Sequence, residues 1–428
     1  MVQAISALCK GLLAYVSIVS GGYIMRAFRS DKTCQTFASL ARLRQEFVCG
    51  CLAWLWVCTA LHAQDLPRFR EHVITGELKY GYQLAAADLN KDGKKDLIAV
   101  DERATELVWF ENRHPAWERH VLADNVPRQI NADCWDTDAD GIPEVVLAYH
   151  FETDPNKSVG NVVFLKSGQD VRQPWTAKEI DRVPTAHRVR WIDPEGNGKK
   201  LLLVAPMVGV RFPPAYEDPV PIYLYRPGEW KRETLSAEPR GVLHAIVPVS
   251  WDGGARQQLL TACYLGLHRF EYSGGKWVAT PISKGDPRPW PESGSSEVRL
   301  GHLGESRFLA AIEPWHGNQL VVYLPEAAAW RRLVLDDKMN NGHALAVADL
   351  NGDNCDEVVC GFRGKGCKLS IYQASDPRGE RWQSTVLDEG GVAAADCAVG
   401  DFTGDGRPDI VSIGASTRNL KLYENMGK

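Results

Sequence analysis

From residue 65 onward the chain is a succession of short apolar segments separated by turns. In the first unit these segments are Leu84–Ala87, Leu97–Val100 and Leu107–Phe110. Apolar runs of this length that are bounded by turn residues are typical of β-strands. The pattern therefore predicts an all-β fold built from short strands.

An aromatic residue followed five residues later by Ile or Leu recurs seven times. The pairs lie 47 to 58 residues apart, and three further apolar segments follow each pair. Four strands in about 50 residues is the period of a propeller blade. The sequence therefore predicts a seven-bladed β-propeller of four-stranded blades. The pairs are Phe69/Ile74, Trp117/Leu122, Trp175/Ile180, Trp230/Leu235, Trp277/Ile282, Trp330/Leu335 and Trp382/Leu387.

The two ends of the predicted ring complement each other. An aromatic strand at Arg68–Ile74 comes first, and a strand of the third type at Leu420–Asn425 comes last. If the first strand became the outer strand of the last blade, the ring would close and leave no sheet edge at the seam. We therefore expect residues 68–75 to pair with residues 420–425, and the propeller to occupy residues 64–428.

An acidic loop with the pattern D-x-[DN]-x-D-G-x-x-[DE] lies between the first and second strands of several units. Oxygen atoms at alternate positions converge only if the chain wraps tightly, which a residue tolerant of positive φ permits. Such hard ligands suit Ca²⁺, so we expect structural calcium rather than a regulatory or ligand-bridging ion. The four loops contain Asp88, Asn90, Asp92 and Asp96; Asp136, Asp138, Asp140 and Glu144; Asp349, Asn351, Asp353 and Glu357; and Asp401, Thr403, Asp405 and Asp409.

The third, fourth and fifth units have lost the acidic pattern. The loop of the third unit ends on Leu201 instead of an acid, and Trp251–Arg256 and Gly301–Arg307 keep little of the pattern. We expect no calcium in these units. The four intact loops resemble those of FG-GAP/VCBS repeats, a resemblance that covers nearly all of residues 65–428.

Residues 1–63 differ from the rest of the chain, because they hold five of the eleven cysteines and two apolar stretches flanked by Arg and Lys. The apolar run Phe47–Leu61 ends in a small-residue exit typical of a signal-peptidase site, so the mature protein would start near Gln64. This predicts a targeting segment and an exported protein, periplasmic or secreted, without a stable membrane span after cleavage. A membrane anchor is the alternative, although this run is shorter than the roughly 20 residues that a spanning helix needs. Met25 is a second candidate for the initiator.

Charge and cysteine spacing argue against nucleic acid as a partner and against zinc bound by cysteines. The net charge is −5, and no basic run is present, so the chain lacks the electrostatic footprint of a nucleic-acid-binding protein. Six cysteines remain after residue 63 without a CxxC spacing, which argues against a cysteine zinc site. Cys360 and Cys367 are the one near pair to test for a disulfide.

Histidine recurs at one register of the predicted inner strands. It stands six residues before the first loop position in three units, as His187, His244 and His343. Inner strands line the channel of a propeller, so equivalent positions converge near its axis. Three imidazoles there would form an open metal site, for which Zn²⁺ is the first expectation and Fe, Mn or Ni the alternatives.

Other polar residues fall on the same predicted face. His316 lies in the loop between the second and third strands of the fifth unit. Tyr82, Asp286 and Glu297 lie in or beside segments that lead into first strands. Together with a metal, these residues predict a catalytic pocket. We expect His316 to be the leading general base or acid, because imidazole titrates near neutral pH, and the other three to be weaker candidates for proton delivery or hydroxyl recognition.

At these positions the chain resembles the propeller domain of fungal aldos-2-ulose dehydratases. The resemblance covers most of blades three to six and implies a metal-dependent lyase that eliminates water from a small keto-sugar such as glucosone or 1,5-anhydrofructose. The fungal enzymes continue into cupin domains, whereas this sequence ends at Lys428, so isomerase activity housed there is not expected. The resemblance rests on Ala186-His187-Arg188, Leu243-His244, Gly285-Asp286-Pro287 with Trp290, Trp315-His316-Gly317-Asn318, and His343.

Two questions stay open at this level. The leaving group could be water or the alcohol of a 3-keto-glycoside. The chain could also be a non-catalytic calcium-binding propeller that binds a glycan or a protein partner. A serine hydrolase or a dinucleotide-dependent oxidoreductase is not favoured, because neither a G-x-S-x-G motif nor a G-x-G-x-x-G opening a helix is present.

Overall fold

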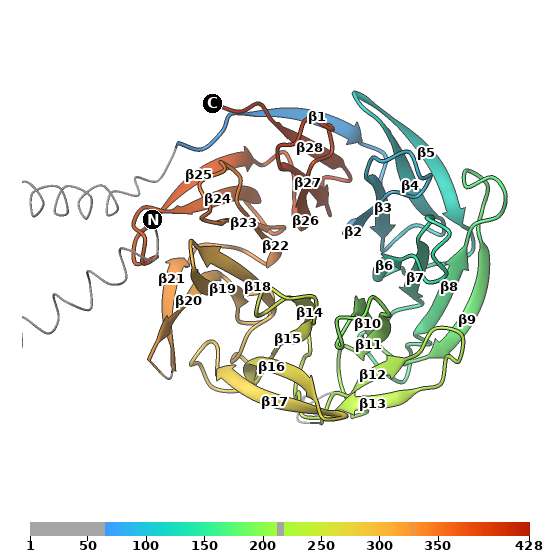
Figure 1. The fold of residues 1–428 in the computed structure, drawn as a ribbon, viewed down its shortest axis with the longest axis horizontal. Helices are drawn as coiled ribbons and strands as arrows, with labels where there is room; N and C mark the ends of the chain where they lie inside the picture. Colours follow the sequence, from blue (N-terminus) through green and yellow to red (C-terminus); the bar gives the residue numbers. More distant parts are fainter. Residues whose placement is uncertain (1–64, 212–217, 328) are drawn as a thin grey trace, which may run out of the picture. The chain divides into compact units, whose positions relative to one another are not determined.

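The computed structural model describes residues 65–211, 218–327 and 329–428. Within these ranges the chain forms 28 strands and no helix, arranged as seven four-stranded antiparallel sheets in a ring (Figure 1). The predicted all-β, seven-bladed propeller is therefore confirmed. The targeting segment expected at residues 1–63 lies outside the described residues. No helix that is long and apolar enough to span a membrane occurs in the described part of the chain.

Each blade runs from an inner strand to an outer strand in sequence order. Blade one contains β2 (Gly81–Ala87), β3 (Asp96–Asp101), β4 (Leu107–Arg113) and β5 (Ala116–Ala123). Blade two contains β6 (Asn131–Trp135), β7 (Glu144–Tyr149), β8 (Asn161–Lys166) and β9 (Thr176–Arg182). Blade three contains β10 (Ala186–Ile192), β11 (Leu201–Pro206), β12 (Ile222–Tyr225) and β13 (Glu233–Ser236). Blades four and five contain β14 (Ala245–Val249), β15 (Gln258–Cys263), β16 (Gly266–Ser273) and β17 (Lys276–Ser283); and β18 (Glu297–Leu303), β19 (Ser306–Glu313), β20 (Gln319–Glu326) and β21 (Ala329–Asp336). Blade six contains β22 (Gly342–Ala348), β23 (Glu357–Phe362), β24 (Lys368–Ala374) and β25 (Trp382–Glu389).

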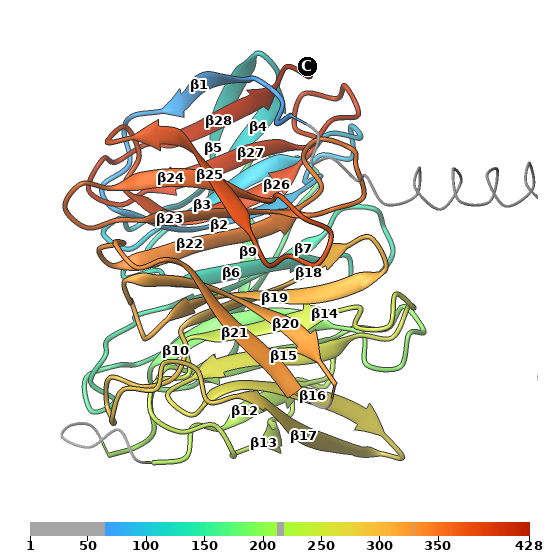
Figure 2. The ribbon, with the colours of Figure 1, turned by 90° about the vertical axis from the view of Figure 1, so that its left-hand side faces the viewer.

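The seventh blade closes the ring with strands from both ends of the described chain. It contains β26 (Ala394–Gly400), β27 (Asp409–Gly414) and β28 (Leu420–Asn425), and its outer strand is β1 (Phe69–Thr75). β1 pairs antiparallel with β28, with Phe69 opposite Asn425. The two strands lie side by side at the top of Figure 2. The predicted seam is confirmed. Closure pairs the outward edge of β28, which would otherwise be free to pair with another chain.

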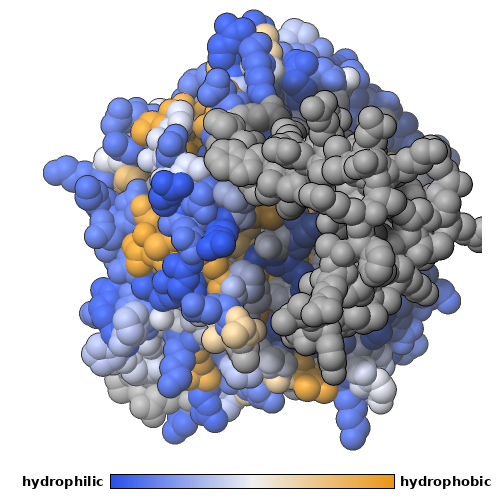
Figure 3. Space-filling view, turned by 60° about the vertical axis from the view of Figure 1, so that its left-hand side comes forward, coloured by the Kyte–Doolittle hydropathy of each residue, from blue (hydrophilic) through white to orange (hydrophobic). Residues whose placement is uncertain are grey.

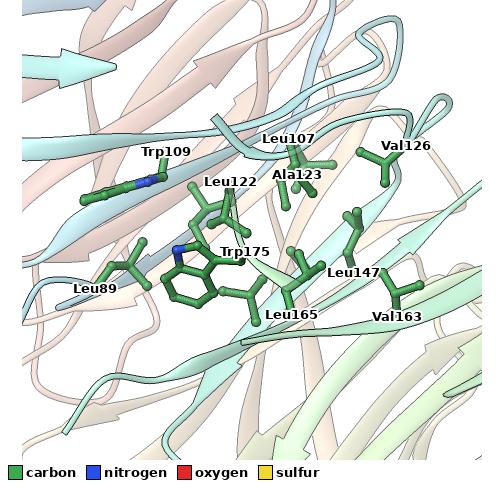
Figure 4. Packing of buried hydrophobic residues seen from close by; sticks show 14 of the residues in the cluster. Leu89, Leu107, Trp109, Leu122, Ala123, Val126, Leu147, Val163, Leu165 and Trp175 are labelled. Carbon is green, nitrogen blue, oxygen red and sulfur yellow. The ribbon is translucent and has the colours of Figure 1, made fainter. Parts of the chain in front are cut away.

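The recurring aromatic residues explain how the blades hold together. The buried hydrophobic side chains form seven large clusters between neighbouring blades, and each cluster contains or contacts one aromatic residue of the repeat. Between blades one and two, Trp175 packs beside the fully buried Trp109 and Leu165 (Figure 4). Burial of one such side chain contributes roughly 1.5–3 kcal/mol. The aromatic period in the sequence is therefore the period of the blade interfaces.

The outer surface is polar with scattered apolar side chains. The face in Figure 3 is mainly hydrophilic, with apolar residues dispersed among polar ones. Four of the exposed large hydrophobic residues are valines on outer strands, namely Val73, Val278, Val334 and Val386. Isolated apolar residues of this kind are normal on a soluble surface. All six cysteines in the described residues are free thiols, including Cys360 and Cys367.

Candidate functional site

An irregularity recurs at the start of every inner strand. In blades one, three, six and seven the strand register shifts at this point. In blades two, four and five the backbone N–H of the residue before the strand bonds to the carbonyl opposite the first strand residue. Such β-bulges re-aim a side chain and are frequent beside active sites. The bulge residues, in blade order, are Tyr82, Ile130, His187, His244, Ser296, His343 and Ala395.

Three imidazoles converge where the inner strands begin. His244 and His343 are bulge residues of blades four and six, and His316 comes from the loop between β19 and β20 of blade five. One ring nitrogen from each lies within 4.8 Å of the others. The Nε2 atoms of His244 and His316 are 3.1 Å apart. We call His244, His316 and His343 the imidazole cluster.

Two rings of the imidazole cluster are oriented by hydrogen bonds to their Nδ1 atoms. The Nδ1 atom of His244 lies 2.9 Å from a carboxylate oxygen of Glu297, and Nδ1 of His343 bonds to the carbonyl oxygen of Ala395. Both partners are acceptors, so each Nδ1 carries the proton and each Nε2 keeps a lone pair. A histidine that binds a metal is usually held in this way by an acceptor on its other nitrogen.

His187 is adjacent to the cluster, but its Nε2 atom forms hydrogen bonds with other side chains. Its ring centroid lies 4.8 Å from that of His244. Its Nε2 lies 3.0 Å from Nη1 of Arg188 and 3.0 Å from the hydroxyl of Tyr82. A guanidinium can only donate, so this nitrogen must accept, and its lone pair is used. The expected ligand set of His187, His244 and His343 thus differs from the set that converges, in which His316 takes the place of His187.

Burial keeps all four imidazoles neutral near pH 7. It lowers the pKa of His244 to about 4, and it lowers the pKa values of His187, His316 and His343 well below their ordinary value. A neutral imidazole is the form that binds a metal. The buried positions therefore favour ligation at neutral pH without a competing proton.

The spacing of the cluster fits a divalent transition metal. Two nitrogens on one tetrahedral zinc lie about 3.3 Å apart, given a Zn–N bond of roughly 2.0–2.1 Å. The 3.1 Å between the Nε2 atoms of His244 and His316 is close to this value. Two lone pairs at this distance repel each other unless a proton or a cation lies between them. Three neutral imidazoles are a donor set that suits Zn, Fe or Ni.

Charged and polar groups surround the cluster. Glu297 accepts from His244 and pairs with Arg188 at 3.1 Å and with Arg299 at 3.2 Å. Burial alone would raise the pKa of Glu297, but the hydrogen bond to His244 and the charge of Arg188 outweigh it and hold the pKa below its usual range. Burial raises the pKa of Tyr82, and Arg188 opposes part of that rise. Glu297 thus serves as an orienting group for His244.

Asp286, which the sequence also placed at this site, lies apart from the imidazole cluster. Asp286 is buried, and its carboxylate pairs with Arg288 at 3.0 Å rather than with an imidazole. Arg288 reaches the side chain of Asn318, two residues after His316. Asp286 therefore acts on the loop that carries His316 more directly than on the cluster.

Sequence reasoning missed Arg363. It follows β23, in the loop between the second and third strands of blade six, which corresponds to the loop that carries His316 in blade five. Its guanidinium carbon lies 5.4 Å from the ring centroid of Tyr82. A search of all equivalent loops, rather than of histidine alone, would have found it.

The four acidic loops share one turn. In each, the first aspartate accepts a hydrogen bond from the backbone N–H five residues later, and that later residue has a positive φ between 63° and 90°. The donors are Gly93, Gly141, Asn354 and Gly406. Blade three keeps this bond, from Gly198 to Asp193 at 2.7 Å, although its loop ends on Leu201. The turn thus persists where the last acid is lost.

The last acid of each loop is buried. Burial raises the pKa of Asp96 to about 7 and that of Glu357 to about 8, and it also raises the pKa of Asp409. A bound calcium ion would stabilise the ionised form of these carboxylates. Their burial therefore fits a calcium site in blades one, six and seven.

Blade two differs because a lysine reaches its loop. The Nζ atom of Lys166 lies 2.7 Å from Glu144 and 2.5 Å from Asp138. Lys166 follows the residue opposite Val145 in the third strand. The corresponding residues of blades one, six and seven are Glu111, Gln373 and Glu424, none of which is a cation.

Comparison with known proteins agrees with this architecture. Residues 159–326 match the family model of the β-propeller domain of aldos-2-ulose dehydratase, and residues 349–412 match the FG-GAP-like repeat. The first match contains His187, His244, Glu297 and His316. Aldos-2-ulose dehydratase of Phanerodontia chrysosporium is 26% identical over 415 residues, which cover 84% of this chain and 45% of the relative. The chain thus spans about half the length of that protein.

Solved structures resemble the chain in fold alone. The extracellular domain of BT4673 from B. thetaiotaomicron has a TM-score of 0.52 and 12% identity over 84% of this chain and 40% of its own. BBS1N, solved in complex with ARL6DN, has a TM-score of 0.52 and 11% identity over 85% of this chain and 98% of its own. The chain is a β-propeller with FG-GAP-like repeats that resembles the propeller domain of aldos-2-ulose dehydratase.

Proposed function

We propose that this propeller is a metal-dependent lyase that eliminates a β-substituent from a keto-sugar. The observation that carries the proposal is the convergence of His244, His316 and His343, two of which are held through Nδ1 by Glu297 and the Ala395 carbonyl. The similarity to a sugar dehydratase over 84% of the chain supports the same class of reaction. The substrate is a small keto-sugar, with water or a sugar-bound alcohol as the leaving group.

The imidazole cluster would hold the metal, and Zn²⁺ is the first choice. When bound, the ion would supply Lewis-acid polarisation of the substrate carbonyl. The protein's share is to orient the ligand rings, which the buried acceptors on Nδ1 of His244 and His343 achieve for two of the three. This assignment gives His316 a ligand role in place of the general-base role expected from the sequence, because its Nε2 lies 3.1 Å from that of His244.

Tyr82 and His187 are placed to move the proton, and Nε2 of His187 would take it in place of the hydrogen bond that it accepts from Arg188. The hydroxyl of Tyr82 lies 3.0 Å from Nε2 of His187 and 3.3 Å from Nε2 of His343. In the reaction, the C–H bond beside the carbonyl breaks, its proton passes to the base, and its electron pair moves onto the carbonyl oxygen. Return of that pair expels the β-substituent with a proton, and an enone remains. Arg188 and Glu297 hold the base and the ligands in place.

Metal content and turnover test the proposal together. We expect about one transition metal per chain after exchange into calcium-free buffer, and enone absorbance with at least one member of a panel of 2-keto and 3-keto sugars. A triple variant with His244, His316 and His343 replaced by alanine should lose both, whereas His302→Ala, at an exposed histidine, should keep both. A wild-type chain without transition metal would contradict the lyase and favour a non-catalytic propeller that binds a glycan or a protein.

A further inference from the structure

Two guanidinium groups beside the cluster share one buried carboxylate. Arg188 is paired with Glu297 at 3.1 Å, and the second oxygen of Glu297 is paired with Arg299 at 3.2 Å. Both guanidinium groups are therefore already engaged within the protein. If the site takes a substrate that becomes negative during the reaction, a further cation that faces the substrate would add to its stabilisation.

Arg363 lies beside the site and has no such pairing among the described residues. Its Nε donates to the side-chain oxygen of Asn341 at 3.3 Å, and it pairs with no carboxylate among the described residues. Its guanidinium lies over the ring of Tyr82, at 5.4 Å from the centroid. The hydroxyl of the same ring lies 3.3 Å from Nε2 of His343. Among the described residues, the Arg363 side chain thus contacts Asn341 and the Tyr82 ring, beside the imidazole cluster.

Arg363 approaches the site through Tyr82. Its guanidinium faces the Tyr82 ring, while the hydroxyl of that ring lies 3.0 Å from Nε2 of His187 and 3.3 Å from Nε2 of His343. A cation in this position would act on an anion bound beside these groups.

We infer that Arg363 is the residue that binds the oxyanion of the substrate, with its planar guanidinium facing the two adjacent oxygens of an enediolate. This inference rests on the proposed function and deepens it, because it names the residue that recognises negative charge. Guanidinium matches paired oxygens through two parallel N–H bonds, which a lysine cannot reproduce. Stabilisation of an oxyanion by a preorganised cation is a large term in such reactions.

Oxalate is the probe, because it is a planar dianion with two adjacent oxygens, as in an enediolate. Its affinity for the zinc-loaded full chain would be measured by calorimetry, with zinc content determined on the same samples. Arg363→Met should weaken oxalate binding at least about tenfold without loss of zinc. Arg103→Met is the matched control, because that guanidinium lies over the ring of Tyr80 at 4.5 Å in blade one, and it should bind oxalate as the wild type does.

Arg363→Lys keeps a long aliphatic chain and the positive charge. It is the test variant to use if Arg363→Met lowers Tm. We expect it to bind oxalate with an affinity between those of the wild type and Arg363→Met. Equal affinity in wild type and Arg363→Met, with zinc present in both, would overturn the inference and leave the metal site standing. A wild-type chain that holds no zinc and binds no oxalate would overturn both the inference and the proposed function.

Discussion

Blades that keep the acidic loop and blades that supply histidine are largely different blades. Blades one, two and seven have complete loops and carry Tyr82, Ile130 and Ala395 at the bulge. Blades three, four and five have incomplete loops and supply His187, His244 and His316. Blade six has a complete loop and supplies His343. The complete acidic loops and the clustered histidines thus lie largely in different blades, and blade six has both. The bulge register is common to all seven blades, so a change of one residue there adds chemistry without altering the fold.

Substitutions within the histidine blades should produce the largest effect. His316→Ala should reduce the transition metal from about one per chain to none, because it removes one of three converging nitrogens. His187→Ala is the matched comparison and should retain the metal, because Arg188 already engages Nε2 of His187. Metal analysis of both purified variants checks this. Loss of metal in His187→Ala with retention in His316→Ala would restore the ligand set expected from the sequence.

Calcium should act on the loop blades with a pH dependence of its own. The pKa values of Asp96 and Glu357 are raised to about 7 and about 8, so without calcium the folded state holds protons that the unfolded state has released. The stability that these carboxyls contribute is present at low pH and is lost as pH rises through 7 to 8. Calcium binds the ionised form, so it should raise Tm by about 5 °C at about pH 8.5 and much less at about pH 5.

The control for the calcium prediction is Asp96→Asn, which should reduce the pH dependence of the calcium effect. The histidine variants should leave it unchanged, since the loops and the imidazole cluster share no residue. Thermal denaturation with and without millimolar calcium measures both. A calcium effect of equal size at the two pH values would argue against these carboxylates as ligands.

The smallest effect should distinguish blade two from the other loop blades. Lys166 places an ammonium among Asp138 and Glu144, so the loop of blade two should depend less on calcium than its counterparts. Lys166→Met should add about one bound calcium per chain, because it frees those carboxylates. Lys178→Met, at an exposed lysine on β9, is the control. Equilibrium dialysis with radioactive calcium gives the stoichiometry, and an unchanged count would refute the role of Lys166.

The fold was predictable from the sequence because its signals are periodic. The aromatic residue that marks each unit packs between two blades, and the strand order follows the chain except at the seam. The bulge register was equally accessible, because Tyr82, His187, His244 and His343 stand at a constant distance from the loop. The acidic turn was also anticipated, since the residue after the acidic run has positive φ in all four complete loops.

The composition of the site was less predictable, because it depends on which side chains touch, both within a blade and between blades. The contact of Arg188 with Nε2 of His187 decides which nitrogens are free, and no spacing encodes it. His316 and Arg363 stand at the same distance after the bulge residues of their blades, but this spacing does not show which side chains they contact. Lys166 is on a third strand, 22 residues from Glu144, and only strand pairing brings the two together.

The central claim is that imidazoles from three blades share one ion. An anomalous difference map from crystals of the zinc-loaded full chain, collected at the zinc absorption edge, tests it most directly. We predict one strong peak within about 2.0–2.1 Å of ring nitrogens of His244, His316 and His343. A peak confined to the acidic loops, or no peak at the inner strands, would contradict the account.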